Sequence, residues 1–179
     1  CVLRDMEFMQ FHPTLLYVAG LERTLITEAL RGYGAYLRNS HGERFMIGKH
    51  DLAELAPRDV VARNIVHEMH RTGDACAFLD VTHLDQSELA RRFPQFMKMC
   101  EEAEIHCSKS WVPVRPGPHY MLGGVKSDLD GNTSIQGLLV AGEVSSTGLH
   151  GANRLASNSL IEGLVAGMRA ASNATKQPR

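Results

Sequence analysis

The feature that most constrains this chain is a helix-forming segment at residues 153–175 that offers almost no polar face. A helix turns by about 100° per residue, so large apolar side chains gather on one side and small ones on another: Leu160, Ile161, Leu164, Val165 and Met168 against Ala156, Ser159, Gly163, Ala166, Gly167 and Ala170. Only Asn158, Glu162 and Arg169 remain for a polar edge. Because helices of this kind are buried on two sides, we expect the small face to lie against a strand or a flat ligand.

A short apolar run, residues 138–141, and a loop rich in glycine and serine precede this helix. The order of strand, glycine-rich loop and buried helix is typical of an α/β sheet that binds a ligand at the carboxyl end of its strand. The chain has too few further strands to complete a doubly wound sheet. We therefore predict one edge of an incomplete α/β domain here.

The preceding residues predict a mixed lobe of helices and strands, so the expected fold class is α+β. Val61, Ile65 and Met69 recur at helical spacing between Pro57 and Gly73, which suit the start and the end of a helix. The other expected elements are strands at 6–11 (stopping at His12-Pro13), 24–28, 77–81, 112–114, 119–125 and 137–144, a hairpin of 35–38 and 43–45 around residues 39–42, a helix after an Asp85–Glu88 capping box, and a helix from Pro94 to about 103.

Composition excludes several classes of function. The 19 Lys and Arg residues nearly balance the 20 Asp and Glu residues, and no basic run is interleaved with aromatics, so we expect no nucleic-acid and no membrane partner. The apolar run at 138–141 is far too short to span a bilayer, and no signal peptide is visible. Four cysteines without a two-residue spacing favour reduced thiols in a cytoplasmic protein over a zinc or disulfide framework.

Two apparent metal-binding motifs fail. The histidines of His67-Glu68-Met69-His70 are three residues apart instead of the four that a zinc protease needs. The run from Asp128 to Asn132 resembles a calcium loop but has Thr133 in place of the required glycine. We therefore expect no metal.

Polar and cationic side chains stand at the ends of several predicted elements. Each one alone is more often a structural polar group, but Arg58 lies on the buried stripe of its helix, where a guanidinium must meet an anion. A second arginine, Arg154, stands before the last helix. Two arginines with histidines and a hydroxyl suit a small dicarboxylate, and we expect Arg58 and Arg154 to share one anion pocket. The accompanying candidates are Gln10, His12, Thr27, Glu28, His119 and His150.

Six stretches of the chain together resemble the fumarate reductase/succinate dehydrogenase flavoprotein family, in order and spacing: residues 6–14, 27–32, 42–46, 57–63, 119–120 and 142–160. Within the family, residues 147–160 are most similar to the members that oxidise L-aspartate. The resemblance implies a capping (substrate) domain at 12–115 and a partial FAD-binding domain made of 1–11 and 116–179.

The resemblance also implies an activity, which is FAD-dependent oxidation of L-aspartate to iminosuccinate. Oxygen or fumarate would reoxidise the flavin, and the product would enter NAD biosynthesis, with quinolinate synthase as a possible partner. Carried over residue by residue, Arg58 is the expected catalytic proton donor and acceptor. The expected substrate ligands are Gln10, His12, Thr27, Glu28, His119 and Arg154, and the expected flavin contacts are Glu143, Asn158, Ser159 and Leu160.

Two departures from the family pattern qualify this expectation. Tyr33 stands where members usually have Glu, and the glycine fingerprint of the dinucleotide-binding half is missing. We therefore expect a segment that is colourless and inactive when isolated. The alternatives are a succinate dehydrogenase or fumarate reductase flavoprotein subunit, and a non-catalytic dicarboxylate-binding module.

Overall fold

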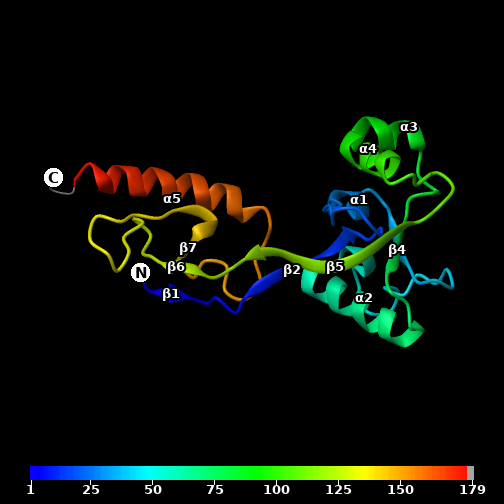
Figure 1. The fold of residues 1–179 in the computed structure, drawn as a ribbon, viewed down its shortest axis with the longest axis horizontal. Helices are drawn as coiled ribbons and strands as arrows, with labels where there is room; N and C mark the ends of the chain where they lie inside the picture. The colour runs from blue at the N-terminus through cyan, green and yellow to red at the C-terminus, as the bar shows by residue number, and fades with distance from the viewer. Residues whose placement is uncertain (177–179) are drawn as a thin grey trace. The chain divides into compact units, whose positions relative to one another are not determined.

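The computed structural model describes residues 1–176 as a mixed α and β protein with two sheets, which confirms the predicted α+β class. The chain divides into two compact units. We call Phe11–Gly117 the central unit, and Cys1–Gln10 together with Pro118–Arg179 the terminal unit. Both boundaries fall inside strands, because β2 (Met9–Leu16) and β5 (Val112–Met121) run from one unit into the other (Figure 1).

The central unit is built on a four-stranded sheet of order β2-β5-β4-β3. β3 (Tyr36–Arg38) and β4 (Ala77–Asp80) pair antiparallel, and so do β4 and β5. The register aligns Leu37, Leu79 and Val112 across three neighbouring strands, and all three side chains are fully buried. Each such burial contributes about 1.5–3 kcal/mol, so this row anchors the core.

Helices and short turns complete the central unit: α1 (Ala29–Gly32), η1 (Ala53–Leu55), α2 (Arg58–Thr72), α3 (Gln86–Arg92) and α4 (Pro94–Glu102). Helix α2 buries Val61, Ile65 and Met69 in the core, as their spacing predicts, and Gly73 ends it with a φ of 77°. Since glycine reaches positive φ without steric cost, this termination is also as predicted.

The terminal unit holds a three-stranded sheet of order β1-β6-β7 and one long helix. Its elements are β1 (Leu3–Arg4), β6 (Gly124–Lys126), η2 (Gly142–Val144), β7 (Ser145–Ser146) and α5 (Asn158–Ala174). Strands β1 and β6 are antiparallel, whereas β6 and β7 are parallel. The sheet needs Gly123 and Gly124, because a Cβ at either position would lie 2.2 Å from Asp5 O or 2.4 Å from Val144 O.

Some predicted strands are wrong. Strand β2 does not stop at His12-Pro13 but runs through both residues to Leu16. It tolerates Pro13, which has no N–H to donate, because β2 lies at the edge of its sheet. Residues 24–28 contribute only the isolated bridge of Leu25 to Leu15. Residues 119–125 are divided between the ends of β5 and β6.

The predicted hairpin is half right. The turn exists, since Gly42 N–H donates to Asn39 O at 3.1 Å and Gly42 has a φ of 84°. Residues 43–45, however, form no strand, and β3 pairs with β4 instead. The reason is that a pairing with β4 lets Leu37 enter the buried row of the sheet, which a local hairpin arm would not provide.

The capping prediction for α3 is confirmed on one side only. The Asp85 carboxylate accepts from the backbone N–H groups of Ser87 and Glu88, which caps the helix. Glu88 does not return the bond; its carboxylate accepts from Arg91 and Arg92 instead. Helix α4 begins at Pro94, as predicted.

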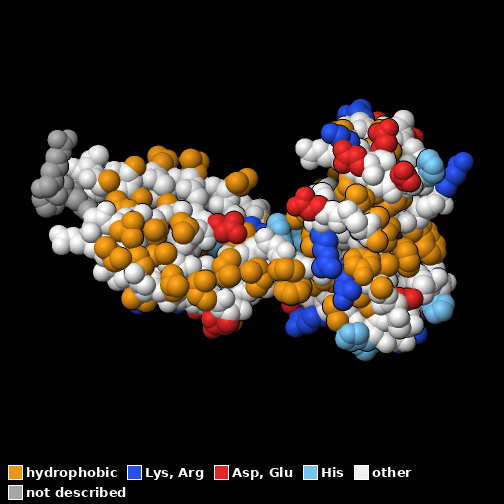
Figure 2. Space-filling view, viewed as in Figure 1, with side chains coloured by type: hydrophobic (Ala, Val, Ile, Leu, Met, Phe, Trp, Pro, Cys, Tyr) orange, Lys and Arg blue, Asp and Glu red, His pale blue; other side chains and the backbone are white. Residues whose placement is uncertain are grey.

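The C-terminal helix differs most from expectation. Residues 137–144 contain only a bridge of Leu139 to Asn132 and the turn η2 in place of a strand, and α5 begins at Asn158, not near Asn153. The prediction of burial on two sides is wrong for the described residues, because Ala170 alone is buried and Leu160 is 87% exposed. Figure 2 shows apolar side chains exposed along α5. The described part of the terminal unit has too few elements to cover a helix that is apolar on nearly all sides.

None of the helices within residues 1–176 is long and apolar enough to cross a lipid bilayer.

Candidate functional site

Arg58 is the first residue of α2, and its side chain is 15% exposed. Its Nε donates to Glu28 Oε2 at 2.6 Å, so one edge of the guanidinium is neutralised by a carboxylate. Nη1 is buried and meets no hydrogen-bond partner among residues 1–176. A buried charged donor without an acceptor costs more than about 1–3 kcal/mol, and Arg58 therefore presents a binding site for an anion.

Arg31, which sequence reasoning did not single out as a site residue, is a second buried cation in the same unit. It lies at the end of α1, donates from Nη1 to Glu54 O, and leaves Nε and Nη2 buried without a partner in the described part of the chain. Burial lowers the pKa of Arg31, and the neighbouring charge of Arg58 adds to the effect, while Glu28 and Glu54 oppose it. The available signal was its position one helical turn after Glu28.

Glu28 thus stands between two arginines. It accepts from Arg58 directly and acts on Arg31 through its charge. Its own side chain is 41% exposed, so it also reaches solvent. A carboxylate in this position holds the Arg58 guanidinium in one orientation and offers a proton acceptor beside it.

His12 lies fully buried on β2, and Thr27 is exposed just before α1. His12 Nδ1 accepts from Thr14 N–H at 3.2 Å, so the proton of the neutral ring lies on Nε2 and makes that atom the donor. The hydroxyl of Thr27 accepts from Ala29 N–H at 3.3 Å, which supports the first turn of α1. A donor and a hydroxyl of this kind can bind a carboxylate.

Arg154 is the buried cation of the terminal unit. Gln10 binds it twice: Nε2 of Gln10 donates to Arg154 O at 2.7 Å, and Oε1 of Gln10 accepts from Arg154 Nε at 3.1 Å. Nη1 of Arg154 donates to Ser159 Oγ at 2.7 Å, and the guanidinium carbon lies 3.7 Å from the centre of the Tyr120 ring. These contacts orient Arg154, with a cation–π contact adding about 0.5–2 kcal/mol.

His150 and Glu162 form a second pair in the terminal unit, and it is largely buried. His150 Nε2 lies 2.5 Å from Glu162 Oε2, and each side chain is 9% exposed. The hydroxyl of Thr147 donates to the other Glu162 oxygen at 3.1 Å. The edge contact of Tyr120 with His150, at 6.0 Å between ring centres, connects this pair to Arg154. The pair ties the loop 147–154 to α5.

The residues expected to hold a flavin lie at the start of α5 and in η2, which packs on α5. Asn158 and Leu160 are exposed, Ser159 is partly buried, and Glu143 is exposed in η2. Ser157 makes no side-chain cap on the first turn of α5. The N–H groups of Asn158 and Ser159 already donate to Leu155 O and Ala156 O, so this end of the helix attracts an anionic group through its dipole. The exposed apolar face that begins at Leu160 suits a flat aromatic ring, and these residues fit a flavin.

His119 and Tyr33 complete the comparison with the sequence. His119 is exposed on β5, next to the buried Tyr120. Tyr33, which replaces the usual Glu, directs its ring at Phe93, 5.7 Å away between centres, and at Arg92, 5.2 Å away. Tyr33 therefore packs against the α3–α4 segment and contributes an apolar contact where the family usually has a charge.

The structure brings some candidates into contact within each unit: Glu28 accepts from Arg58 in the central unit, and Gln10 and Ser159 accept from Arg154 in the terminal unit. Arg58, Glu28 and the newly recognised Arg31 belong to the central unit, as do His12 and Thr27. The terminal unit contains Gln10, His119, Arg154, Glu143, Asn158, Ser159 and Leu160. No group of three His, Cys, Asp or Glu side chains within residues 1–176 is arranged to hold a metal ion.

Comparisons with known proteins identify the family of this chain. A family model described as FAD binding domain matches residues 1–160. The L-aspartate oxidase of Mycobacterium leprae (strain TN) is 50% identical over 170 residues, which cover 93% of this chain and 32% of the relative. The L-aspartate oxidase of Agrobacterium fabrum is 51% identical over 177 residues, which cover 99% of this chain and 33% of the relative. The chain thus spans about a third of the length of these curated relatives.

Two solved structures are also similar to this chain. A variant of the E. coli quinol fumarate reductase matches with a TM-score of 0.87 and 38% identity over 97% of this chain and 32% of that one. The Sdh1 complex of Mycobacterium smegmatis matches with a TM-score of 0.70 and 38% identity over 99% of this chain and 31% of that one.

Proposed function

Since this chain belongs to the FAD-binding domain family, we propose that it forms part of an FAD-dependent enzyme that oxidises L-aspartate to iminosuccinate, with oxygen or fumarate as the final electron acceptor. The curated relatives at about 50% identity are named L-aspartate oxidases, which supports aspartate over other diacids. Iminosuccinate would enter NAD biosynthesis through a quinolinate synthase, which argues for a cytoplasmic protein.

One observation carries the proposal, which is the buried Nη1 of Arg58 that has no acceptor within residues 1–176. Glu28 already neutralises the opposite edge of the guanidinium at Nε, so the remaining donor is directed at a ligand. A substrate carboxylate supplies the charge-assisted hydrogen bond that the site lacks, worth about 1.5–3 kcal/mol.

L-Aspartate carries two carboxylates, and arginine is suited to bind such a group. Arg58 in the central unit and Arg154 in the terminal unit are each proposed as a carboxylate ligand. Arg154 suits this role because Gln10, Ser159 and Tyr120 hold its guanidinium in one orientation, which lowers the entropy lost on binding. His12, Thr27 and His119 would donate further hydrogen bonds to the carboxylates.

The reaction removes two hydrogens from aspartate, one with its electron pair and one as a proton. FAD, when bound, supplies the acceptor for the electron pair. The chain's own residues would accept the proton. We assign this proton transfer to Arg58, with Glu28 at 2.6 Å as the neighbouring acceptor. Glu28 also reaches solvent, which gives the proton a route out.

The residues proposed to hold the flavin are Glu143, Asn158, Ser159 and Leu160. Glu143 would accept from the hydroxyls of the ribityl chain, and Leu160 with Ser159 would lie against the ring system. The positive end of the α5 dipole favours negative charge on the ring. On this assignment the central unit is a capping domain and the terminal unit is part of an FAD-binding domain.

The test uses the full-length enzyme and compares Arg58→Lys with Arg63→Lys. Arg63 belongs to the same helix but is 74% exposed and paired with Asp59, so it provides a matched control. Arg58→Lys should lower kcat for aspartate by about 10²-fold or more, because lysine cannot bind Glu28 and an anion in the same geometry, whereas Arg63→Lys should leave kcat nearly unchanged. Equal losses from both variants would refute the assignment.

A second candidate function is the interconversion of succinate and fumarate, which the similarity to the fumarate reductase structure with a TM-score of 0.87 favours. The same full-length protein separates the two activities. Aspartate-dependent release of hydrogen peroxide supports the oxidase, whereas succinate-dependent reduction of a dye without peroxide release supports the alternative.

A further inference from the structure

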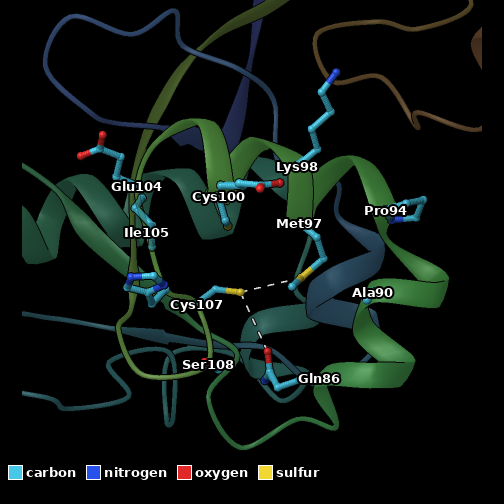
Figure 3. Close-up of a pocket in the computed structure, with 12 residues that line it drawn as sticks. Gln86, Ala90, Pro94, Met97, Lys98, Cys100, Glu104, Ile105, Cys107 and Ser108 are labelled. Carbon is cyan, nitrogen blue, oxygen red and sulfur yellow. Dashed lines mark hydrogen bonds between the residues drawn. The ribbon is translucent and has the colours of Figure 1, made fainter.

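Away from the candidate site, a pocket of about 940 Å³ opens beside α4 in the central unit. Two of the chain's four cysteines, Cys100 and Cys107, line this pocket together with Met97 and Gln86 (Figure 3). Neither cysteine contributes to the proposed oxidation of aspartate. A pocket that leads to two neighbouring thiols gives a small oxidant access to side chains that are otherwise buried.

The backbone brings the two cysteines together. Glu104 has a φ of 56°, which reverses the chain directly after α4. Ile105 N–H then donates to Cys100 O at 2.8 Å, and Cys107 N–H donates to Ile105 O at 3.0 Å. This tight return folds the segment that carries Cys107 over the last turn of α4, where Cys100 lies. Close approach of the two backbones is what a disulfide requires.

The two thiols interact but lie in different surroundings. Cys107 Sγ lies 3.8 Å from Met97 Sδ and 3.9 Å from Gln86 Oε1, as Figure 3 shows. The hydrogen bond with the Cys100 thiol lowers the pKa of Cys107, and the same bond together with burial raises the pKa of Cys100. Cys107 is therefore the better nucleophile of the pair.

We propose that Cys100 and Cys107 form a reversible dithiol–disulfide pair that hydrogen peroxide oxidises. In the first step the Cys107 thiolate attacks one peroxide oxygen, the O–O bond breaks, and Cys107 becomes a sulfenic acid while the released hydroxide takes a proton to give water. In the second step Cys100 sulfur attacks Cys107 sulfur, the S–O bond breaks, and the thiol proton leaves with the hydroxyl as a second water. Two thiols and one peroxide thus give one disulfide and two waters.

The inference goes beyond the proposed function, because the oxidant is added from outside and no flavin is needed. Purified full-length protein is treated with hydrogen peroxide, unfolded in the presence of an alkylating reagent, and digested with trypsin. Cleavage after Lys98 and Lys109 places both cysteines in one peptide, residues 99–109. We expect this peptide to become resistant to alkylation and to lose the mass of two hydrogens, and a reductant should restore both labels.

Variants separate the two roles. Cys100→Ser should leave a sulfenic acid on Cys107 that dimedone labels, whereas Cys107→Ser should leave Cys100 unmodified. Cys76→Ser is the control and should not change the result, because burial raises the pKa of Cys76 and slows its reaction with peroxide. If the serine variants fail to fold, the mass of the wild-type peptide decides alone.

Two results would overturn the proposal. One is that peroxide treatment oxidises Cys1 or Cys76 while peptide 99–109 still takes two alkyl groups, which would show that Cys100 and Cys107 are not the reactive pair. The other is irreversible oxidation of Cys107 to a sulfinic acid while Cys100 still takes its label, which would show that the thiols do not pair.

Discussion

The central and terminal units differ in where their apolar side chains lie. The central unit contains one continuous core from Leu16 to Val114, in which α2 and the four-stranded sheet bury each other. Among the described residues of the terminal unit, the buried apolar side chains are only Tyr120, Leu122 and Ala170. The central unit packs several helices on its sheet, whereas the terminal unit has one long helix and a sheet of short strands. The difference teaches that a hydrophobic face is buried only where other elements are present to cover it.

The exposed face of α5 shows the consequence. Leu160, Leu164 and Met168 are each at least 67% exposed, and a contiguous apolar surface of this kind marks a place where further protein or a ligand binds. Polar pairs fix the position of the loop before α5 instead of apolar contacts. These pairs are Gln10 with Arg154 and His150 with Glu162. The terminal unit therefore orients side chains without a core of its own, whereas the central unit is stabilised by its core.

Leu79→Ala should give the largest effect on this comparison. Leu79 is fully buried in the row with Leu37 and Val112, so its truncation should lower the free energy of unfolding by about 2–5 kcal/mol. The matched variant in the terminal unit is Leu164→Ala, which should change that free energy by no more than about 0.5 kcal/mol, because Leu164 is 67% exposed. Urea unfolding of the isolated chain measures both, and similar losses would contradict the contrast between the units.

Gln10→Ala tests whether polar contacts hold the terminal unit's cation. The variant removes the hydrogen bond that Arg154 Nε makes to the Gln10 carbonyl oxygen at 3.1 Å. Hydrogen bonds to charged groups contribute about 1.5–3 kcal/mol, so KM for aspartate in the full-length enzyme should rise by about 10-fold to 100-fold. Gln136→Ala, at an exposed position, should leave KM unchanged; a KM for Gln10→Ala that matches this control would show that Arg154 needs no support.

The smallest of these effects should be the acid-dependent loss of the stabilisation that Glu68 gives the central unit. Hydrogen bonds from Arg71 and Asn39 lower the pKa of Glu68 below its ordinary value of 4.5, against the opposing effect of burial. A carboxylate whose pKa is lower in the folded state stabilises the fold above its unfolded pKa, and this stabilisation disappears as the pH falls below 4.5 through the folded value. Glu68→Gln should therefore lower Tm by a few degrees at neutral pH and by less in acid. A Tm difference that does not depend on pH would exclude this linkage.

Local patterns predicted much of the central unit. The spacing of Val61, Ile65 and Met69, with Pro57 before and Gly73 after, predicted α2 to within a residue, because helical periodicity and end signals act over short distances. The same pattern placed Arg58 on the inner side of its helix, where its side chain is 15% exposed. The resemblance of the sequence to known flavoproteins correctly predicted the family.

Local sequence patterns could not predict which distant strands pair with each other. Nothing local indicates that β3 pairs with β4 or that β2 continues through Pro13, since both depend on the place of a strand in the completed sheet. Arg31 escaped notice for a related reason, because its burial arises from packing between α1 and the turn around Glu54.

The amino-acid sequence by itself determined the family, the central helix and the charged residues available for a diacid, since these follow from residue types at short spacing. Only the tertiary structure decided which donors lack acceptors, which thiols meet and which faces stay uncovered. Burial and hydrogen-bond satisfaction depend on neighbours that are distant along the chain, and Arg58, whose Nε meets Glu28 while Nη1 meets no acceptor within residues 1–176, shows both at one side chain.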